Sequence, residues 1–405
     1  MLDSKMIEII KSTVPVLEIH GQTITTTFYQ AMFKNHPELL NIFNHANQRQ
    51  GKQPTALANA VYAAAVHIDR LEEILPVVKG IAQKHRALGI RPEHYPIVGE
   101  NLLAAIKTVL GDAATDDILE AWGQAYGIIA DVFISVEAQM YNEAAQQKGG
   151  WDGFRRFVVD RKVKESEVIT SFYLKPEDGN EIASYQPGQY ITIRVKPENQ
   201  EFTHLRHYSL STAPGHAYYR ISVKREDAIL NQPAGIVSSY LHNEIGEGDI
   251  LELTAPAGDF TLDQSKQTPV VLLSGGVGLT PMVSMLETIV QNTPERKVTY
   301  IHAARNGSQH AMKEHIIELT NQYSNLQSYL VYESPEMDES CDKSGYIDLP
   351  WLQTIVDPQA DFYFCGPVPF MRAINQALRE WGVPEERIHF EFFGPADTLE
   401  NTASE

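Results

Sequence analysis

The feature of this sequence that most limits its possible folds is a change in hydrophobic periodicity at a glycine-rich joint, residues 148–153 (Lys-Gly-Gly-Trp-Asp-Gly). Before the joint, from residue 2 to about residue 147, apolar residues recur at the spacing that is typical of helices. After it, β-branched and aromatic residues alternate with polar ones in short segments, which is typical of strands. The sequence therefore predicts an all-α domain followed by a β-rich domain.

A second change of pattern occurs near residue 263. Beyond it, short apolar strands alternate with amphipathic runs of helix length, which indicates a doubly wound parallel sheet. Because a chain of 405 residues is too long for one core, we predict three domains: an all-α domain (1–147), a small antiparallel β-barrel (151–263) and an α/β domain (268–405).

The expected elements follow from the same patterns. The barrel strands are expected over 154–163, 168–175, 190–195, 218–224 and 249–254. In the α/β domain we expect strands over 269–274, 298–303, 326–332, 361–365 and 387–393, and helices over 280–291, 310–322 and 368–381. Residues 334–345 are expected to form an acidic, solvated loop, and residues 396–405 a polar tail.

The charge balance argues against one class of partner. With 52 acidic and 33 basic residues the net charge is −19, which repels nucleic acid and anionic lipid surfaces. The two cysteines, Cys341 and Cys365, have no metal-like spacing and fit a reducing compartment. No run of about 18 apolar residues occurs, and the N-terminus reads as an amphipathic helix and not as a secretion signal. We expect a cytoplasmic protein with no integral membrane segment.

One histidine of the helical third lies on an apolar face. The spacing of Val78, Ile81 and Leu88 places His85 on the same inward side of a helix. A buried imidazole needs a partner, and taken alone it is more often a satisfied core histidine than a metal ligand. His85 is therefore a candidate ligand whose assignment depends on its surroundings.

A carboxylate occupies a similar position in the long helix expected over 117–143. Glu137 shares one face with Tyr126, Ile129 and Phe133. Since an isolated buried carboxylate is costly, Glu137 either receives hydrogen bonds or reaches solvent at the helix edge.

The segment Arg206-His207-Tyr208-Ser209 carries chemistry that suits a flavin nucleotide. An arginine can clamp a pyrophosphate, a tyrosine ring can stack on the isoalloxazine, and a serine hydroxyl can hydrogen-bond the reactive flavin nitrogen. With a Pro-Gly-Gln-Tyr segment ending at Tyr190 upstream and residues 237–242 downstream, it resembles the ferredoxin–NADP reductase superfamily. The resemblance implies that Tyr190 lines the flavin and that the downstream helix start cradles its phosphates.

A glycine loop follows the first strand expected in the α/β domain. Glycine lets a backbone approach a phosphate closely, and a strand before and a helix after the loop are the context that a nucleotide site requires. The loop residues are Gly275, Gly276, Val277, Gly278, Leu279 and Thr280. They are predicted to bind the pyridine nucleotide.

Two further segments match the same superfamily. Cys365-Gly366-Pro367 ends a predicted strand, and the resemblance implies that it borders the nicotinamide, although a lone cysteine is usually just a small buried residue. The last predicted strand ends in Glu391, Phe392, Phe393, Gly394 and Pro395. In relatives an aromatic of this strand lies over the flavin, which is the place expected for Phe393, whereas some relatives carry cysteine where Phe392 stands.

The helical third resembles a globin. Phe43, Gln53 and His85 match the phenylalanine that wedges the haem, the polar residue that faces the bound gas and the histidine that binds iron. Lys84, beside that histidine, is included among the cofactor contacts. Tyr29 matches the distal tyrosine that donates a hydrogen bond to dioxygen, although alone it would be an ordinary core aromatic.

Together, the three motif sets resemble flavohaemoglobins over residues 1–395. The resemblance implies haem b, FAD and NAD(P)H as cofactors, and a nitric oxide dioxygenase that turns nitric oxide and dioxygen into nitrate. We expect a monomer, although the sequence itself does not determine the oligomeric state. In that family the iron-binding histidine is coupled to a tyrosine and a glutamate, matched here by Tyr95 and Glu137. A histidine strengthened in this way favours O–O bond chemistry over storage of dioxygen.

Two other functions stay open at this point. One is an oxygen carrier or sensor whose reductase only keeps the iron ferrous, against which Tyr95 and Glu137 argue. The other is a peroxide or quinone reductase that works through the flavin. The choice between NADH and NADPH is open too, because Arg305 can meet a 2′-phosphate or face water.

Overall fold

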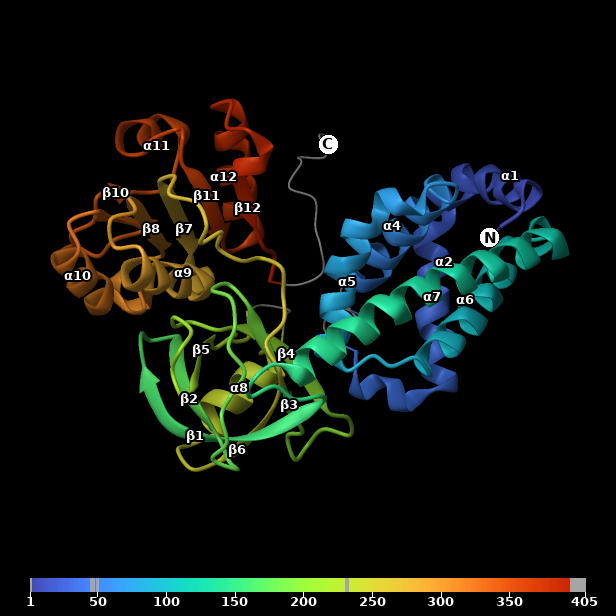
Figure 1. Cartoon of the computed structure of the whole chain (residues 1–405), viewed down its shortest axis with the longest axis horizontal. Helices are drawn as coiled ribbons and strands as arrows, with labels where there is room; N and C mark the ends of the chain where they lie inside the picture. Colours follow the sequence, from blue (N-terminus) through green and yellow to red (C-terminus); the bar gives the residue numbers. More distant parts are fainter. Residues whose placement is uncertain (1, 44–47, 49–50, 230–232, 394–405) are drawn as a thin grey trace.

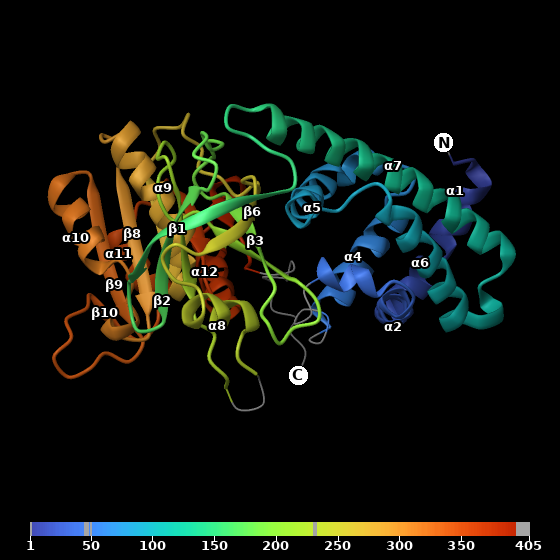
Figure 2. The same ribbon diagram turned by 90° about the horizontal axis from the view of Figure 1, so that it is seen from below.

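The computed structural model describes residues 2–43, 48, 51–229 and 233–393. It contains a helical domain, an antiparallel barrel and a parallel-sheet domain, and the barrel lies between the other two (Figures 1 and 2). The predicted fold class is confirmed. The limits of the three domains stay predictions, and Met1 and the tail over 396–405 lie outside the described residues.

The helical domain packs its apolar faces around one core that includes Phe28, Met32 and Trp122. Its α-helices are α1 (Ser4–Ser12), α2 (Val14–Asn35), α4 (Lys52–Val66), α5 (Leu75–Leu88), α6 (His94–Leu110) and α7 (Asp116–Gln146). Short 3₁₀ turns are η1 (Pro37–Asn41), η2 (Leu71–Ile74) and η3 (Gly111–Ala113). Helix α5 stops at Gly89, whose φ of +80° is a left-handed conformation that glycine adopts without strain. This stop places His85 in the last turn of α5.

The barrel is a six-stranded antiparallel sheet in the order β4-β3-β6-β1-β2-β5. Its strands are β1 (Phe154–Lys164), β2 (Ile169–Pro176), β3 (Tyr190–Val195), β4 (His204–Ser209), β5 (Tyr219–Lys224) and β6 (Ile250–Thr254), with helix α8 (Ile236–Asn243). An isolated bridge between Leu210 and Ile221 joins the two edge strands β4 and β5, which closes the sheet.

The third domain is a parallel sheet in the order β10-β9-β8-β7-β11-β12. Its strands are β7 (Val270–Gly275), β8 (Val298–Ala304), β9 (Leu326–Tyr332), β10 (Lys343–Ser344), β11 (Asp361–Cys365) and β12 (Ile388–Phe390). Helices α9 (Leu279–Asn292) and α10 (Lys313–Gln322) cover one face, and α11 (Leu349–Ile355) and α12 (Val368–Glu380) cover the other. Short 3₁₀ turns are η4 (Gly276–Gly278), η5 (Gly307–Gln309) and η6 (Glu385–Arg387).

The stretch predicted as a solvated loop, residues 334–345, differs from the prediction at its end. Lys343 and Ser344 form the edge strand β10 and pair with Val331 and Tyr332. Asp342 supports the pairing, since its Oδ2 accepts from Leu330 N at 2.7 Å. An edge strand tolerates charged residues because one of its sides faces solvent, so an acidic composition does not exclude a strand there.

The chain enters the barrel after α7, but helix α5 also contacts the barrel at strand β3. The buried Arg86 donates from Nη2 to the carbonyl of Pro256 at 2.5 Å, and Gly258 N donates to Gln83 Oε1 at 3.4 Å. Ala87 packs against Tyr190 in a small buried cluster. The helix that carries His85 is therefore fixed directly to the strand that carries Tyr190.

Among the described residues, no helix combines the length and the apolar character that crossing a bilayer requires.

Candidate functional site

His85, Tyr95 and Glu137 come together from α5, α6 and α7. His85 Nδ1 lies 2.7 Å from Glu137 Oε1, and Tyr95 OH donates to the same oxygen at 2.6 Å. The Tyr95 hydroxyl also lies 3.3 Å from His85 Nδ1. Since an ionised carboxylate only accepts hydrogen bonds, Nδ1 carries the proton and Nε2 keeps its lone pair. That is the tautomer in which an imidazole binds a metal through Nε2.

The surroundings of this group explain why Tyr95 acts as a hydrogen-bond donor to a buried carboxylate. The Glu137 side chain is only 3% exposed, so its two hydrogen bonds offset the cost of burying it. Burial and the hydrogen bond to Glu137 raise the pKa of Tyr95 well above its usual value. Tyr95 therefore stays protonated and acts as a donor, as the glutamate requires.

Tyr29, Gln53 and Phe43 form a second group in the helical domain. The rings of Tyr29 and Phe43 meet edge to face at 5.8 Å. Burial raises the pKa of Tyr29, and a hydrogen bond from the side chain of Gln53 partly opposes that rise. Gln53 Oε1 is buried and has no hydrogen-bond partner among the described residues. A buried amide oxygen without a partner points to a missing ligand or water.

Both groups fit a haem. His85 offers an Nε2 lone pair, and the second group offers a hydroxyl, an amide and aromatic faces in an apolar core that also contains Leu57 and Val61. The individual roles at the haem stay predictions.

The flavin motif lies on β4, next to β3. Tyr190 pairs with Ser209 and Ile191 pairs with Tyr208 in the antiparallel register. The Tyr190 hydroxyl is buried without a partner among the described residues, and its ring lies 4.8 Å from that of His207. Arg206 Nη1 donates to the carbonyl of Leu205 at 2.7 Å. The structure thus places the predicted flavin residues on the neighbouring strands β3 and β4, on alternating faces of the sheet, and the unpartnered Tyr190 phenol fits a polar ligand such as FAD.

Replacing Ser209 with alanine should slow reduction of the FAD by NADH roughly two- to tenfold, because one neutral hydrogen bond contributes about 0.5–1.5 kcal/mol. Anaerobic stopped-flow absorbance measures this rate, and haem and flavin contents should stay normal. Ser184→Ala, at an exposed position before β3, is the matched control. An unchanged rate in Ser209→Ala would show that the motif is misaligned.

The two nucleotide motifs meet at the carboxyl edge of the parallel sheet. Cys365 pairs with Ser274 in the register of β11 and β7, which places residues 365–367 beside the loop of residues 275–280. A Cβ at Gly278 would overlap the Cys365 carbonyl, and Gly276 has a φ of +52°. The motifs therefore contact each other through bare backbone, leaving a cradle that fits a dinucleotide phosphate. Burial raises the pKa of Cys365, so its sulfur stays a thiol.

The end of the last strand faces the helical domain. Burial raises the pKa of Glu391 to about 8, while Lys84 on α5 lowers it and Asp259 raises it. Phe393 is 49% exposed, and Phe392 packs at the margin of the sheet core. Gly394 and Pro395 lie outside the described residues. Lys84 of the helical domain and Glu391 of the parallel-sheet domain thus interact electrostatically.

Two buried charged residues that make contacts between domains, Arg86 and Glu287, were not among the predicted site residues. Arg86 follows His85 directly, and Glu287 is the only charge within α9. For Glu287, a single charge in an otherwise apolar helix is the signal that could have found it, whereas α5 contains other charged residues and gives no such signal for Arg86.

Comparisons with known proteins agree with this architecture. The globin family model matches residues 26–133, the oxidoreductase FAD-binding domain matches residues 156–262, and the oxidoreductase NAD-binding domain matches residues 272–376. The chain is 58% identical to a flavohemoprotein of Halalkalibacterium halodurans over 397 residues, 97% of each chain. It is 53% identical to the flavohemoprotein of Bacillus subtilis over 404 residues, 98% of this chain and 99% of the relative.

Solved structures give the same result. A flavohemoglobin from Malassezia yamatoensis with bound FAD and heme superposes with a TM-score of 0.83 at 26% identity, covering 97% of this chain and all of the other. The FAD/NAD-binding domain of nitric oxide dioxygenase from Vibrio cholerae matches at 42% identity with a TM-score of 0.55. That match covers 60% of this chain and 99% of the domain.

Proposed function

Because the chain belongs to the flavohaemoprotein family, with haem, FAD and NAD(P)H as its cofactors, we propose that it is a nitric oxide dioxygenase. It consumes nitric oxide and dioxygen, takes electrons from NAD(P)H and releases nitrate. When bound, the FAD supplies the conversion of a two-electron donor into single electrons, and haem b supplies dioxygen binding and activation.

The hydrogen-bonded group of His85, Tyr95 and Glu137 carries this proposal. Glu137 accepts from His85 Nδ1 at 2.7 Å, which gives the imidazole partial anionic character and makes Nε2 a stronger donor. Such an electron-rich ligand favours rearrangement of the O–O bond over reversible storage. It therefore supports the enzyme over an oxygen carrier or sensor.

On the other side, Tyr29 is expected to hold the gas ligand. Its hydroxyl stays protonated because burial raises its pKa, so it can donate a hydrogen bond to a partly negative oxygen. Gln53, with its unpartnered Oε1, and Phe43, whose ring contacts that of Tyr29, belong to the same side of the proposed haem site. These residues orient the dioxygen for attack by nitric oxide and limit access of water.

In the reductase part, Arg206, Tyr208 and Ser209 are proposed to hold and orient the FAD. The glycine loop over 275–280 and Cys365 are proposed to hold the NAD(P)H. The same arrangement would serve a peroxide or quinone reductase, but such an enzyme does not need the Glu137 group.

Stoichiometry tests the proposal. Nitric oxide and dioxygen form nitrate by gaining one electron, so about two nitric oxide molecules should disappear per NAD(P)H oxidised. A nitric oxide electrode, NADH absorbance and nitrate analysis measure this in the holoenzyme, with a sample lacking NADH as the control. If consumption stopped after one nitric oxide per haem despite excess NADH and dioxygen, the oxygen-binding function would replace the dioxygenase.

The proposal includes a monomer that works in the cytoplasm. Both cysteines are free thiols in the structure, which is consistent with a reducing compartment. Light scattering of the purified holoenzyme checks the monomer.

A further inference from the structure

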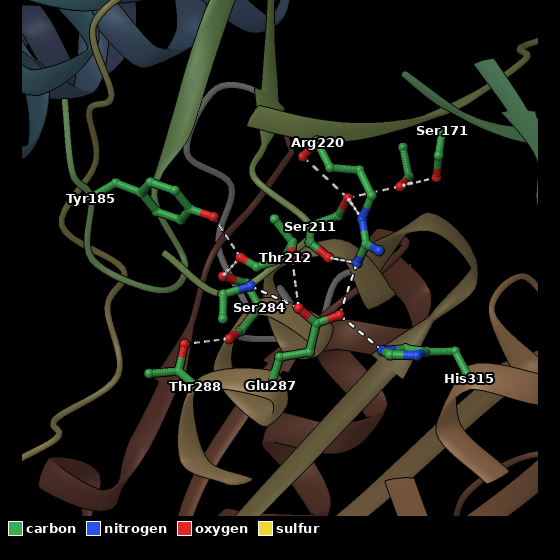
Figure 3. Close-up of polar contacts among 11 residues, drawn as sticks. Ser171, Tyr185, Ser211, Thr212, Arg220, Ser284, Glu287, Thr288 and His315 are labelled. Atoms are coloured by element: carbon green, nitrogen blue, oxygen red, sulfur yellow. Dashed lines mark hydrogen bonds and ion pairs between the residues drawn. The ribbon is translucent and has the colours of Figure 1, made fainter. Parts of the chain in front are cut away.

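A buried carboxylate joins the barrel to the parallel-sheet domain. Glu287 lies on α9, and its side chain is 8% exposed. Its two oxygens accept from four groups: Thr212 Oγ1 at 2.6 Å, Ala213 N at 2.8 Å, Arg220 Nη2 at 3.0 Å and His315 Nε2 at 2.9 Å (Figure 3). All of its hydrogen-bonding capacity is directed at fixed donors.

Three of these donors belong to the barrel. Thr212 and Ala213 continue the chain after Ser209 at the end of β4, and Arg220 lies on β5. Ser284, one turn before Glu287 on α9, donates from Oγ to the Thr212 carbonyl at 2.7 Å. Tyr185 donates to the same carbonyl at 2.6 Å from the barrel side (Figure 3). Residues 211–213 are therefore held from both domains at once.

Stability is a poor explanation for this ion pair. Replacing a buried ion pair with apolar residues of similar volume is often neutral or stabilising, so stability alone does not require a charged pair here, although removing one partner leaves the other charge buried and unpaired. Burial raises the pKa of Glu287, but hydrogen bonds from His315, Thr212 and Ala213, together with the charge of Arg220, outweigh it and lower the pKa to about 2. The carboxylate stays ionised at any pH at which the protein works.

The two cofactor motifs are both close along the chain to this contact. Ser209 comes three residues before Thr212. Gly278, the last glycine of the loop, caps the start of α9, and Glu287 lies on the same helix about 14 Å further along at 1.5 Å per residue. Helix α9 and a short strand extension thus connect the flavin motif to the nucleotide loop, through the Glu287 carboxylate and the Ser284 hydroxyl.

We propose that Glu287 is a positioning residue for hydride transfer, which fixes the separation of the flavin strand and the nucleotide loop. The inference rests on the proposed function, in which NAD(P)H reduces the FAD. In that step a hydride, one proton with two electrons, leaves NAD(P)H, which becomes NAD(P)⁺, and the FAD takes it up. The rate depends steeply on the distance and angle between donor and acceptor.

Glu287→Gln tests the proposal. The amide keeps the shape of the side chain, but one of its two ends becomes an NH₂ donor, so the variant side chain can no longer accept from all four groups and the contact with residues 211–213 is weakened. In anaerobic stopped-flow experiments, the limiting rate of flavin reduction at saturating NADH should fall on the order of ten- to a hundredfold. The NADH concentration at half-saturation should change much less. Reduction of the same flavin by dithionite, which needs no alignment, should stay at the wild-type rate.

Amide hydrogen exchange gives a readout that is independent of activity. Exchange in residues 211–213 of the holoenzyme should become faster in Glu287→Gln. Glu318→Gln, on the exposed side of α10, is the matched control and should change nothing. His315→Ala removes one of the four donors to Glu287, and the His315 side chain is 37% exposed. Because this position is partly exposed, His315→Ala should fold even if Glu287→Gln does not. Its limiting rate of flavin reduction by NADH should fall by a smaller factor.

The outcomes separate the two claims. If folded, FAD-loaded Glu287→Gln and His315→Ala were reduced by NADH as fast as the wild type, Glu287 would have no positioning role. Equal slowing with NADH and with dithionite would also overturn it, since that indicates general damage to the flavin site. If NADH failed to reduce the wild-type FAD, the proposed function itself would fail.

Discussion

Replacing His85 with alanine is expected to abolish haem binding and to leave the reduction of ferricyanide by NADH at the wild-type rate. In the proposed function His85 binds the haem iron through Nε2, because Glu137 occupies its Nδ1, and alanine has no replacement donor. The flavin and nucleotide residues lie in the barrel and the parallel sheet, so they keep their structure. Absorption spectra report the Soret and flavin bands, and ferricyanide assays report the reductase.

His20→Ala, at an exposed position on α2, is the control for removing an imidazole from the same domain and should keep its haem. Two results would contradict the prediction. A variant that retained a full Soret band would exclude His85 as the ligand. A folded variant that lost ferricyanide reduction as well would show that the reductase depends on the helical domain. The hydrogen bond from Arg86 to the Pro256 carbonyl would then be the contact through which the helical domain affects the barrel.

The local pattern of the sequence predicts most elements but not their partners. Helix α7, expected over 117–143, spans Asp116–Gln146, and β11 has the predicted limits 361–365. In contrast, the predicted strands omit β4, although it carries the flavin motif, because its polar residues interrupt the alternation on which the prediction depends. The pairing of β6 with β1 and β3, rather than with its neighbour β5, is a long-range contact that periodicity does not contain.

The same limit applies to the candidate site. The helical period turns both His85 and Glu137 inward, and the cost of burying a carboxylate demands a partner for Glu137. Which partner it has depends on how α5, α6 and α7 cross, because 42 and 52 residues separate Glu137 from Tyr95 and His85. Only the resemblance to a family named that pairing beforehand. Glu287 shows the converse, because its signal was present in α9 but three of its four donors come from the barrel.

Replacing Tyr29 with phenylalanine should speed the release of dioxygen roughly ten- to a hundredfold, because a hydrogen bond to a partly charged acceptor contributes about 1.5–3 kcal/mol. The ring is retained, so its contacts with Phe33 and Phe43 keep the pocket filled and the loss is confined to the hydroxyl. Stopped-flow replacement of dioxygen by carbon monoxide measures the release rate in the reduced holoenzyme. Aerobic nitric oxide consumption should fall with it, while the flavin is reduced by NADH as before.

Tyr62→Phe removes a hydroxyl from the neighbouring helix α4 and serves as the control, since Tyr62 is only partly buried against the same core. Its release rate should match the wild type.

The two halves of the helical site make separable contributions in this scheme: Tyr29 slows the escape of dioxygen, whereas Glu137 and Tyr95 strengthen the histidine ligand. If Tyr29→Phe released dioxygen at the wild-type rate, Tyr29 would be a core aromatic, and the stabilising hydrogen bond would have to come from Gln53. If release became faster but nitric oxide consumption did not fall, dioxygen retention would not limit turnover, and the proximal group alone would account for the activity.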